Sequence, residues 1–260
     1  MSKKISIIAL SAIIVLSSFS TLNNSFNNVD QIVIDAGHGG KDPGAHGHLS
    51  KEKDIALKIA LKLGRLIEKY LPEVEVIYTR DADNFVELEQ RAYIANKNGA
   101  DLFISIHCNA VSNSKIYGTE TYVMGLDMVE GNLRVAQKEN SVIYLEENYE
   151  ERYEGFDPNS PESMILLTMS QFAYQESSLE LAANIEKQFR ERAGRKSRGV
   201  KMAPFWVLWR TSMPSVLVET GYLTNSKEEI DLNDPLKQDY IASGIFRAFR
   251  DYKEAIDSTN

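Results

Sequence analysis

Three apolar stretches of this chain each carry, at their ends, a side chain that can do chemistry. The stretches read VIDAGH, FISIH and VLVET, and they end at or beside His38, His107 and Glu219. Near-continuous apolar runs of this length, separated by amphipathic segments, predict strands of an α/β sheet that are buried on both faces. Ligands of such sheets bind at the carboxyl ends of the strands. The sequence therefore predicts that these three residues converge on one site.

Helical periodicity fills the intervals between the strands. The segments with apolar residues at helical spacing are 50–71, 86–100, 176–194 and 239–256. Ser50 is the expected N-cap of the first of these helices. Further strands are expected at 74–80, at 203–209 and, in a more exposed position, at 118–124. Strands alternating with helices predict a single α/β domain with helices on both faces of the sheet.

The N-terminus has the composition of an export signal. Two lysines precede an apolar core, and small residues follow at Ser18–Ser20. The apolar run is shorter than the roughly 20 residues of a membrane-spanning helix, so a cleaved signal is favoured over a retained anchor. We expect a signal peptide at 1–20, a polar linker at 21–30 and a folded domain at 31–255. No stable membrane anchor is expected after cleavage.

Charge and cysteine content limit the class of partner. The chain has a formal net charge of −8, and removal of the signal with its two lysines lowers this to −10. An acidic protein of this kind is not expected to bind nucleic acid. The single cysteine, Cys108, cannot form an internal disulfide and is expected to be a small buried residue.

The two strand-end histidines suit a metal site. Neutral imidazoles are common zinc ligands, and a catalytic zinc takes three protein ligands and leaves one position open. Glu52, just before the first helix, is the best placed carboxylate to complete the set. Each residue also has a simpler explanation, since Glu52 could complement a helix dipole and a lone histidine could be a hydrogen-bonding residue. His46 and His48 are expected to be exposed loop residues.

A segment at 125–176 has no obvious place in a compact α/β unit. Within it, residues 139–162 hold eight acids and one arginine. Such a run is typical of a solvated helix face, but an insertion of this length is more often functional.

At this point the motifs show a resemblance. The stretches IVIDAGHGGKDPGA, EKDIAL, RAYIAN, FISIHCNA, GTETYV, GVKMAPFWVL and MPSVLVETGYLTN occur in the order seen in the zinc-dependent N-acetylmuramoyl-L-alanine amidases of the amidase type 3 family. The resemblance covers residues 31–251 apart from the insertion. It implies a twisted, mixed, largely parallel sheet with one catalytic zinc ion per chain at the strand ends.

Carried over by position, the resemblance implies that His38, Glu52 and His107 are zinc ligands and that Glu219 is the catalytic glutamate. The reaction would be hydrolysis of the amide between the lactyl group of N-acetylmuramic acid and L-alanine in peptidoglycan. Asp35 is a candidate to orient a ligand from behind, with a strand-end capping role as the alternative.

Some members of the family carry an insertion that blocks the active site until an activator binds, and the helical insertion at 125–176 resembles that type. Glu146, Glu147 and Glu150 are candidates for the carboxylate that occupies the open zinc position. The alternative is a substrate-facing lid or a solvated helical hairpin. Inhibition of this kind would imply an envelope-bound protein activator, a role in wall remodelling or cell separation, and a periplasmic location, with a secreted or wall-associated protein as the alternative.

Two other functions stay open at this stage. The same metal and glutamate could hydrolyse an amide within the stem peptide. A non-catalytic wall-binding protein with a structural zinc is the other alternative, although such sites favour cysteine and the chain has only Cys108.

Overall fold

The computed structural model describes residues 28–125, 127, 129–168 and 173–258. The predicted signal peptide at 1–20 and most of the linker lie outside the described residues. Among the residues described, no helix is both long enough and apolar enough to cross a membrane.

Six strands form one twisted sheet in the order β2-β1-β3-β6-β4-β5. The strands are β1 (Gln31–Ala36), β2 (Glu75–Tyr78), β3 (Leu102–Asn109), β4 (Thr119–Met124), β5 (Ser197–Ala203) and β6 (Ser215–Tyr222). Strands β2, β1, β3 and β6 are mutually parallel, whereas β4 runs antiparallel to β6 and β5 runs parallel to β4. The carboxyl ends of β1, β3 and β6 therefore meet at one edge of the sheet.

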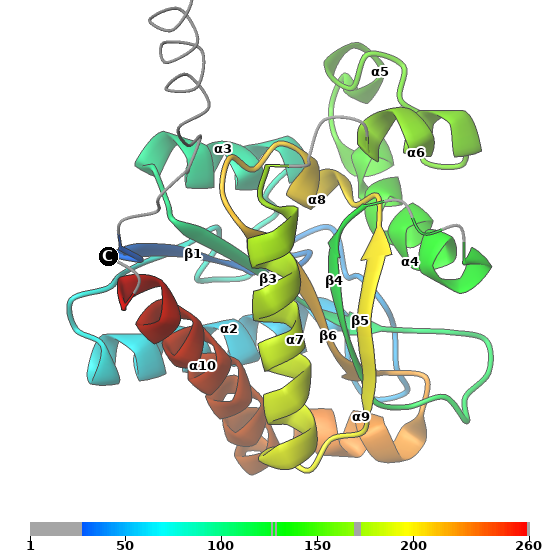
Figure 1. Ribbon diagram of the computed structural model, residues 1–260. Helices are drawn as coiled ribbons and strands as arrows, with labels where there is room; N and C mark the ends of the chain where they lie inside the picture. The colour runs from blue at the N-terminus through cyan, green and yellow to red at the C-terminus, as the bar shows by residue number, and fades with distance from the viewer. Residues whose placement is uncertain (1–27, 126, 128, 169–172, 259–260) are drawn as a thin grey trace, which may run out of the picture.

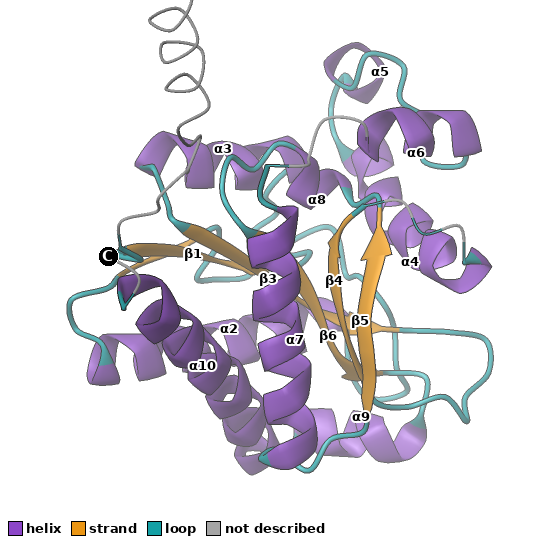
Figure 2. Ribbon diagram, in the orientation of Figure 1, coloured by secondary structure: helices purple, strands orange, loops and turns teal. Residues whose placement is uncertain are grey.

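Helices cover both faces of this sheet (Figures 1 and 2). The helices that pack within the main body are α2 (Glu52–Tyr70), α3 (Leu88–Asn98), α7 (Gln175–Glu191), α8 (Trp206–Trp209), α9 (Ser226–Asn233) and α10 (Pro235–Asp257). Helices α2, α7 and α10 pack on one face, and α3 and α8 on the other. The segment between β4 and α7 contains α4 (Glu130–Asn140), the 3-10 helix η1 (Ser141–Leu145), α5 (Tyr149–Arg152) and α6 (Pro161–Thr168). Figure 1 shows α4, α5 and α6 grouped at one side of the sheet.

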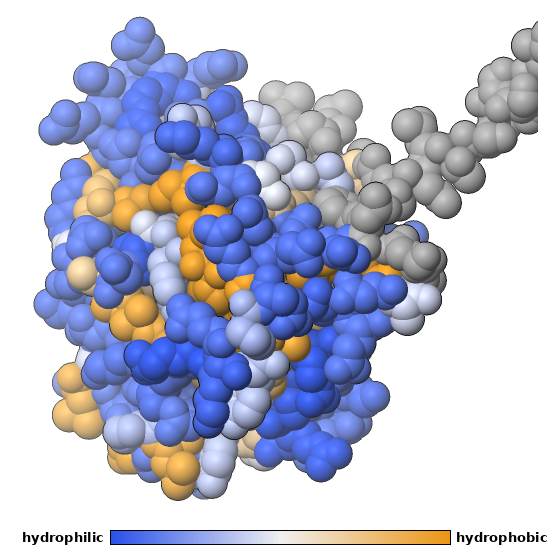
Figure 3. Space-filling view, turned by 90° about the vertical axis from the view of Figure 1, so that its left-hand side faces the viewer, coloured by the Kyte–Doolittle hydropathy of each residue, from blue (hydrophilic) through white to orange (hydrophobic). Residues whose placement is uncertain are grey.

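The core has two layers because the central strands bury both faces. In β1, Ile32 and Ile34 belong to the layer under α2, α7 and α10, whereas Val33 belongs to the opposite layer. This alternation within an uninterrupted apolar run is typical of a parallel strand covered on both sides. On the face shown in Figure 3, hydrophilic residues cover most of the surface and hydrophobic residues emerge in separate groups.

The structure confirms the predicted fold class and corrects three local predictions. Strand β4 is wholly buried rather than more exposed, because α7 and α8 cover its two sides. The strand expected at 203–209 is wrong, since β5 ends at Ala203 and residues 206–209 form α8. Pro204 follows Ala203 and has no N–H to continue a sheet ladder. Helix α2 begins at Glu52, so Ser50 is not its N-cap.

Candidate metal centre

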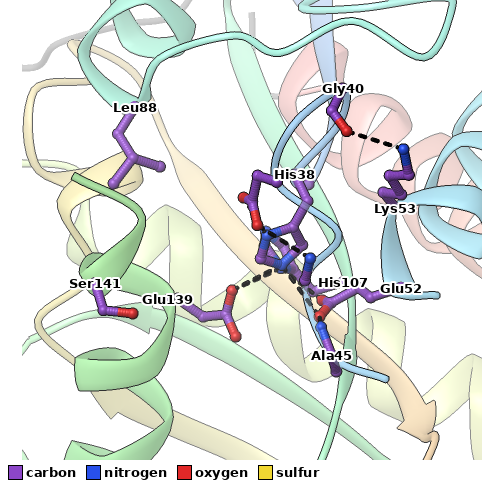
Figure 4. Close-up of polar contacts among 12 residues, drawn as sticks. His38, Gly40, Ala45, Glu52, Lys53, Leu88, His107, Glu139 and Ser141 are labelled. Carbon is purple, nitrogen blue, oxygen red and sulfur yellow. Dashed lines mark hydrogen bonds and ion pairs between the residues drawn. The ribbon is translucent and has the colours of Figure 1, made fainter. Parts of the chain in front are cut away.

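Three of the predicted ligands meet at the carboxyl edge of the sheet. His38 lies two residues beyond β1, Glu52 is the first residue of α2, and His107 lies in β3. All three side chains are buried. Their side chains point toward one another, and Glu139 from α4 approaches the same centre (Figure 4). Each of these four residues offers one donor atom, and the four atoms lie within 4.8 Å of one another.

The distances within this cluster suit a small cation. His38 Nε2 lies 3.1 Å from Glu52 Oε2 and 3.0 Å from Glu139 Oε2. His107 Nδ1 lies 2.9 Å from Glu52 Oε1 and 3.2 Å from Glu139 Oε2. Within the described chain, His38 Nε2 and Glu139 Oε2 are buried and have no hydrogen-bond partner. Two imidazole nitrogens and two carboxylate oxygens around one point form a donor set that fits zinc.

Glycines of the first motif make room for the histidine rings. A Cβ atom on Gly37 would lie 2.4 Å from His107 Cε1, so this position must lack a side chain. Gly44 has φ of +65°, and a Cβ there would lie 2.5 Å from His38 Cδ2. A hydrogen bond of 2.7 Å from the Ala45 N–H to Glu52 Oε2 joins this loop to the first residue of α2. The glycine-rich loop thus brings Glu52 and the two histidines together.

His38 is held from behind by Asp42, which the sequence reasoning missed. Asp42 Oδ2 lies 2.6 Å from His38 Nδ1, and its side chain is buried. A carboxylate on the far nitrogen of a ligating imidazole fixes the tautomer that leaves Nε2 free for a metal. An acid four residues after a candidate ligand histidine was the available signal.

Asp35 supports the site through the backbone. Its carboxylate accepts hydrogen bonds from Thr79 Oγ1 at 2.6 Å, Ser105 Oγ at 2.6 Å and Arg91 Nη1 at 2.7 Å. Burial opposes ionisation of Asp35, but the Arg91 guanidinium and the two hydroxyls outweigh it and lower its pKa. Arg91 Nη2 also donates to the carbonyl oxygen of His38 at 2.8 Å. Because His38 has φ of 61°, this bond holds a backbone conformation that non-glycine residues rarely adopt.

The carboxylate that the insertion brings to the cluster is Glu139, not one of the three expected glutamates. Glu139 is the penultimate residue of α4 and is buried. Its other oxygen, Oε1, pairs with Lys138 Nζ at 3.0 Å. Glu147 and Glu150 are exposed. Glu146 is buried, but it lies outside the group of donor atoms.

Glu146 instead anchors the insertion to the main body. Its Oε1 accepts the backbone N–H of Leu88, the first residue of α3, at 2.8 Å. Its Oε2 accepts the Tyr153 hydroxyl at 2.6 Å. An acid at a helix N-terminus is stabilised by the orphan N–H groups and the helix dipole. Glu146 therefore holds the segment that carries Glu139 against α3.

Glu219 lies at the same edge and has no partner. It is fully buried near the end of β6, directly opposite His107 in the β3–β6 register. Within the described residues neither of its carboxylate oxygens has a hydrogen-bond partner. Burial, together with the negative charges of Glu52 and Glu139, raises its pKa well above the usual value. A buried carboxyl group whose pKa is raised by burial and by nearby like charges is a candidate for a proton-transfer role.

The carboxylates of Glu52 and Glu139 favour the charged forms of both histidines. Burial disfavours the charged form of His107, but Glu139 and Glu52 outweigh it and raise its pKa to about 9. The same two carboxylates raise the pKa of His38 in spite of its burial. The two carboxylates therefore favour positive charge at the centre of the cluster, which a divalent cation would also supply.

The insertion leaves little free space at the cluster. The cavity lined by His38, His107 and Glu139 has a volume of about 10 Å³, and Asn140 and Val142 of the insertion also line it. That is room for about one water molecule. Residues of α4 and η1 therefore border the metal-binding cluster directly.

The remaining singled-out residues lie outside the cluster. His46 and His48 are exposed, and Cys108 is buried. These three placements agree with the sequence predictions.

Comparisons with known proteins give a consistent result. The family model described as N-acetylmuramoyl-L-alanine amidase matches residues 32–251. The N-acetylmuramoyl-L-alanine amidase AmiA of Escherichia coli K12 is 31% identical over 231 residues, which cover 87% of this chain and 77% of AmiA. An N-acetylmuramoyl-L-alanine amidase from Clostridium difficile 630 is similar in structure, with a TM-score of 0.67, 27% identity, and coverage of 88% of this chain and 98% of that one. The CwlD amidase of Clostridioides difficile, solved in complex with the GerS lipoprotein, has a TM-score of 0.64 at 28% identity and covers 87% of this chain and 99% of its own.

Proposed function

This chain belongs to the N-acetylmuramoyl-L-alanine amidase family, and we propose that it hydrolyses the muramoyl–L-alanine amide of peptidoglycan with one zinc ion held by His38, Glu52 and His107. The observation that carries this proposal is the convergence of their donor atoms within a buried cluster at the carboxyl edge of the sheet. Family membership confirms the predicted enzyme class. The metal and the residue roles are the proposed part.

A zinc ion in this cluster would polarise the scissile carbonyl and lower the pKa of a water molecule. The main body supplies three metal ligands, His38, Glu52 and His107, and three protein ligands are typical of a catalytic zinc site. Glu139 makes a fourth, but it comes from the insertion and can leave with it. This distinction separates the site from a permanently closed structural zinc centre.

Glu219 serves as the general base and then as the general acid. Its unpartnered oxygens at the cluster edge are free to accept a proton from the attacking water. The same carboxyl group then donates that proton to the nitrogen of the departing L-alanine. Products are a muramoyl carboxylate and a stem peptide with a free amine. Asp42 holds the ring of His38, and the Asp35–Arg91 pair holds its backbone.

The insertion at 125–176 acts as an autoinhibitory segment. Its carboxylate Glu139 fills the position that substrate and water need, and Glu146 attaches the segment to α3. Displacement of α4 opens the cluster. Because an unregulated wall amidase would lyse its own cell, we assign this opening to a protein activator at the envelope. The complex of the CwlD amidase with a lipoprotein supports an activator of that kind.

The location follows from the substrate. Peptidoglycan lies outside the cytoplasmic membrane, so residues 1–20 direct export, to the periplasm or to the cell wall. No peptidase activity within the stem peptide is proposed, because no described feature favours it.

The test compares the protein with a variant lacking Glu139, each supplied with zinc and a soluble muramoyl peptide. We expect zinc-dependent release of the peptide with a free L-alanine amine, faster in the variant. Cleavage at another bond in both proteins would overturn the proposed reaction.

A further inference from the structure

A second cavity lies at the carboxyl end of β6, outside the metal-binding cluster. Its volume is about 510 Å³, within the range of small-molecule and peptide sites. The basic residues that line it are Lys115, Arg195, Lys196 and Lys227. Two acids line it as well, so its wall carries an excess of positive charge in a chain whose net charge is −8. We refer to it as the basic cavity.

The acids cancel only part of this charge. Glu228, one of the two, accepts hydrogen bonds from Arg195 Nη2 at 2.7 Å and from the Tyr222 N–H at 2.7 Å. It also accepts the Gly118 N–H at 3.0 Å. The Glu228 carboxylate is thus hydrogen-bonded to residues in the cavity wall and beside it. The three lysines make no ion pair among the residues that the structure describes, and each is exposed.

Arg195, which lines the cavity, has a buried and unsatisfied donor. Its side chain is 9% exposed, and its Nε is buried without a hydrogen-bond partner in the described part of the chain. A guanidinium donor rarely stays unpaired when buried. A carboxylate is the acceptor that guanidinium geometry matches best. The wall of the cavity therefore combines an excess of positive charge with a guanidinium group that retains one unpaired N–H.

The basic cavity is joined to the catalytic edge. Arg195 Nη2 donates to the carbonyl oxygen of Thr220, the residue that follows Glu219, at 2.8 Å. On the other side, Glu120 lies opposite Glu219 in the β4–β6 register and binds Arg198 at 2.7 Å and Lys201 at 2.5 Å. Positive side chains thus continue along the edge strand β5 from the cavity to the neighbourhood of Glu219.

Substrate chemistry selects the occupant. The glycan strand of peptidoglycan consists of N-acetylated sugars, and both the sugars and the lactyl amide are uncharged at the point of cleavage. The stem peptide carries free carboxylates a residue or more beyond the cleaved bond. Resting on the proposed amidase function, we propose that the basic cavity is a subsite for the stem peptide and binds a free carboxylate beyond L-alanine. The enzyme then prefers acidic stem peptides over those whose carboxylate is amidated.

The experiment measures binding of two product peptides to the purified protein by calorimetry at low salt. One is L-alanyl-γ-D-glutamyl-L-lysine with its C-terminus as a carboxamide, so that its only free carboxylate is the α-carboxylate of the glutamyl residue. The other is the same peptide with that carboxylate also converted to a carboxamide. Each exposed ion pair contributes a factor of about two to five, so we expect about a tenfold preference for the acid. Raising the salt concentration should shrink this preference, since screening acts within about 10 Å at 0.1 M.

The test variant is the triple substitution Lys115→Gln, Lys196→Gln and Lys227→Gln. All three side chains are exposed, so the fold should be retained. We expect it to bind the acidic peptide about as weakly as the amide, with amide binding unchanged. Equal affinity of the wild-type protein for both peptides would overturn the subsite, and so would an unchanged preference in the variant.

A matched control removes three other exposed lysines, by Lys58→Gln, Lys69→Gln and Lys97→Gln on α2 and α3. It makes the same change in net charge away from the cavity and should keep the preference. Loss of the preference in this control would assign it to net charge and refute the subsite. Because the peptides are products, the result is independent of turnover. A preference without any cleavage would refute the amidase proposal alone.

Discussion

The substitution Glu139→Gln tests whether the insertion inhibits the enzyme. It keeps the size of the side chain but removes the charge that lies 3.0 Å from His38 Nε2 and 3.2 Å from His107 Nδ1. Removing one partner from a buried ion pair costs about 3–5 kcal/mol. Since 1.4 kcal/mol corresponds to a factor of ten, the closed state would lose roughly 100-fold to 3,000-fold of its population relative to the open state.

The gain in activity will be smaller than this shift. Glu146 still binds Leu88 and Tyr153, and the glutamine amide can still contact the cluster. We therefore expect about a tenfold to 100-fold rise in the rate of muramoyl-peptide hydrolysis in the absence of any activator. The assay follows release of the free L-alanine amine, with zinc content measured on the same samples.

Glu147→Gln is the matched control, because it makes the same charge change at an exposed position of the same insertion. It should leave the rate unchanged. A folded, zinc-loaded Glu139→Gln protein with the wild-type rate would refute the autoinhibitory role of this carboxylate. A rise of equal size in both variants would show that the effect comes from net charge.

Three further predictions concern the site and its support. Glu219→Gln should retain zinc and lose about 100-fold to 10,000-fold in rate, measured by peptide release and metal analysis; substantial remaining activity would exclude it as the base. Gly37→Ala should lower activity about 100-fold because the new Cβ would displace the His107 ring, whereas Gly131→Ala, which meets nothing within 4 Å, should not; equal rates would contradict the packing argument. Burial raises the pKa of Asp35, but a buried guanidinium and two hydroxyls outweigh it and lower the pKa below 3.8, so its stabilisation is complete above that pH and is lost as pH falls through the folded-state pKa. Asp35→Asn should lower the free energy of unfolding, measured with urea, by about 3 kcal/mol at neutral pH. It should also reduce the loss of stability as pH falls; an unchanged pH dependence in the variant would refute the assignment.

Local pattern was enough to predict the sheet and the residues at its edge. The apolar runs that precede His38, His107 and Glu219 are long enough to be buried strands, and parallel strands bring their carboxyl ends together. Glu52 could be placed because it begins a helix directly after the loop that carries His38. These features depend on residues close in sequence, which periodicity describes well.

Contacts between distant segments could not be predicted in the same way. The acidic run of the insertion contains several glutamates, and the one that reaches the cluster depends on how α4 is rotated and where it packs against β5. Glu146 instead accepts a hydrogen bond from the backbone N–H of Leu88, 58 residues away, at the start of α3. Ser50, expected to cap α2, donates its hydroxyl to Glu229 instead, across 179 residues.

The secondary-structure errors have similar causes. Strand β4 carries several polar residues, which indicated exposure, but Thr119 and Thr121 are buried because they donate to Glu186 of α7. The apolar stretch after Ala203 is short, and short apolar runs do not distinguish a strand from a helical turn.

The most direct test of the central claim is mass spectrometry of peptidoglycan fragments treated with the metal-depleted protein before and after addition of zinc. The account predicts no cleavage before zinc and, after it, stem peptides that begin with a free L-alanine amine, at the highest yield with Glu139→Gln. Cleavage that does not need zinc, or zinc-dependent cleavage elsewhere in the peptide, would contradict it.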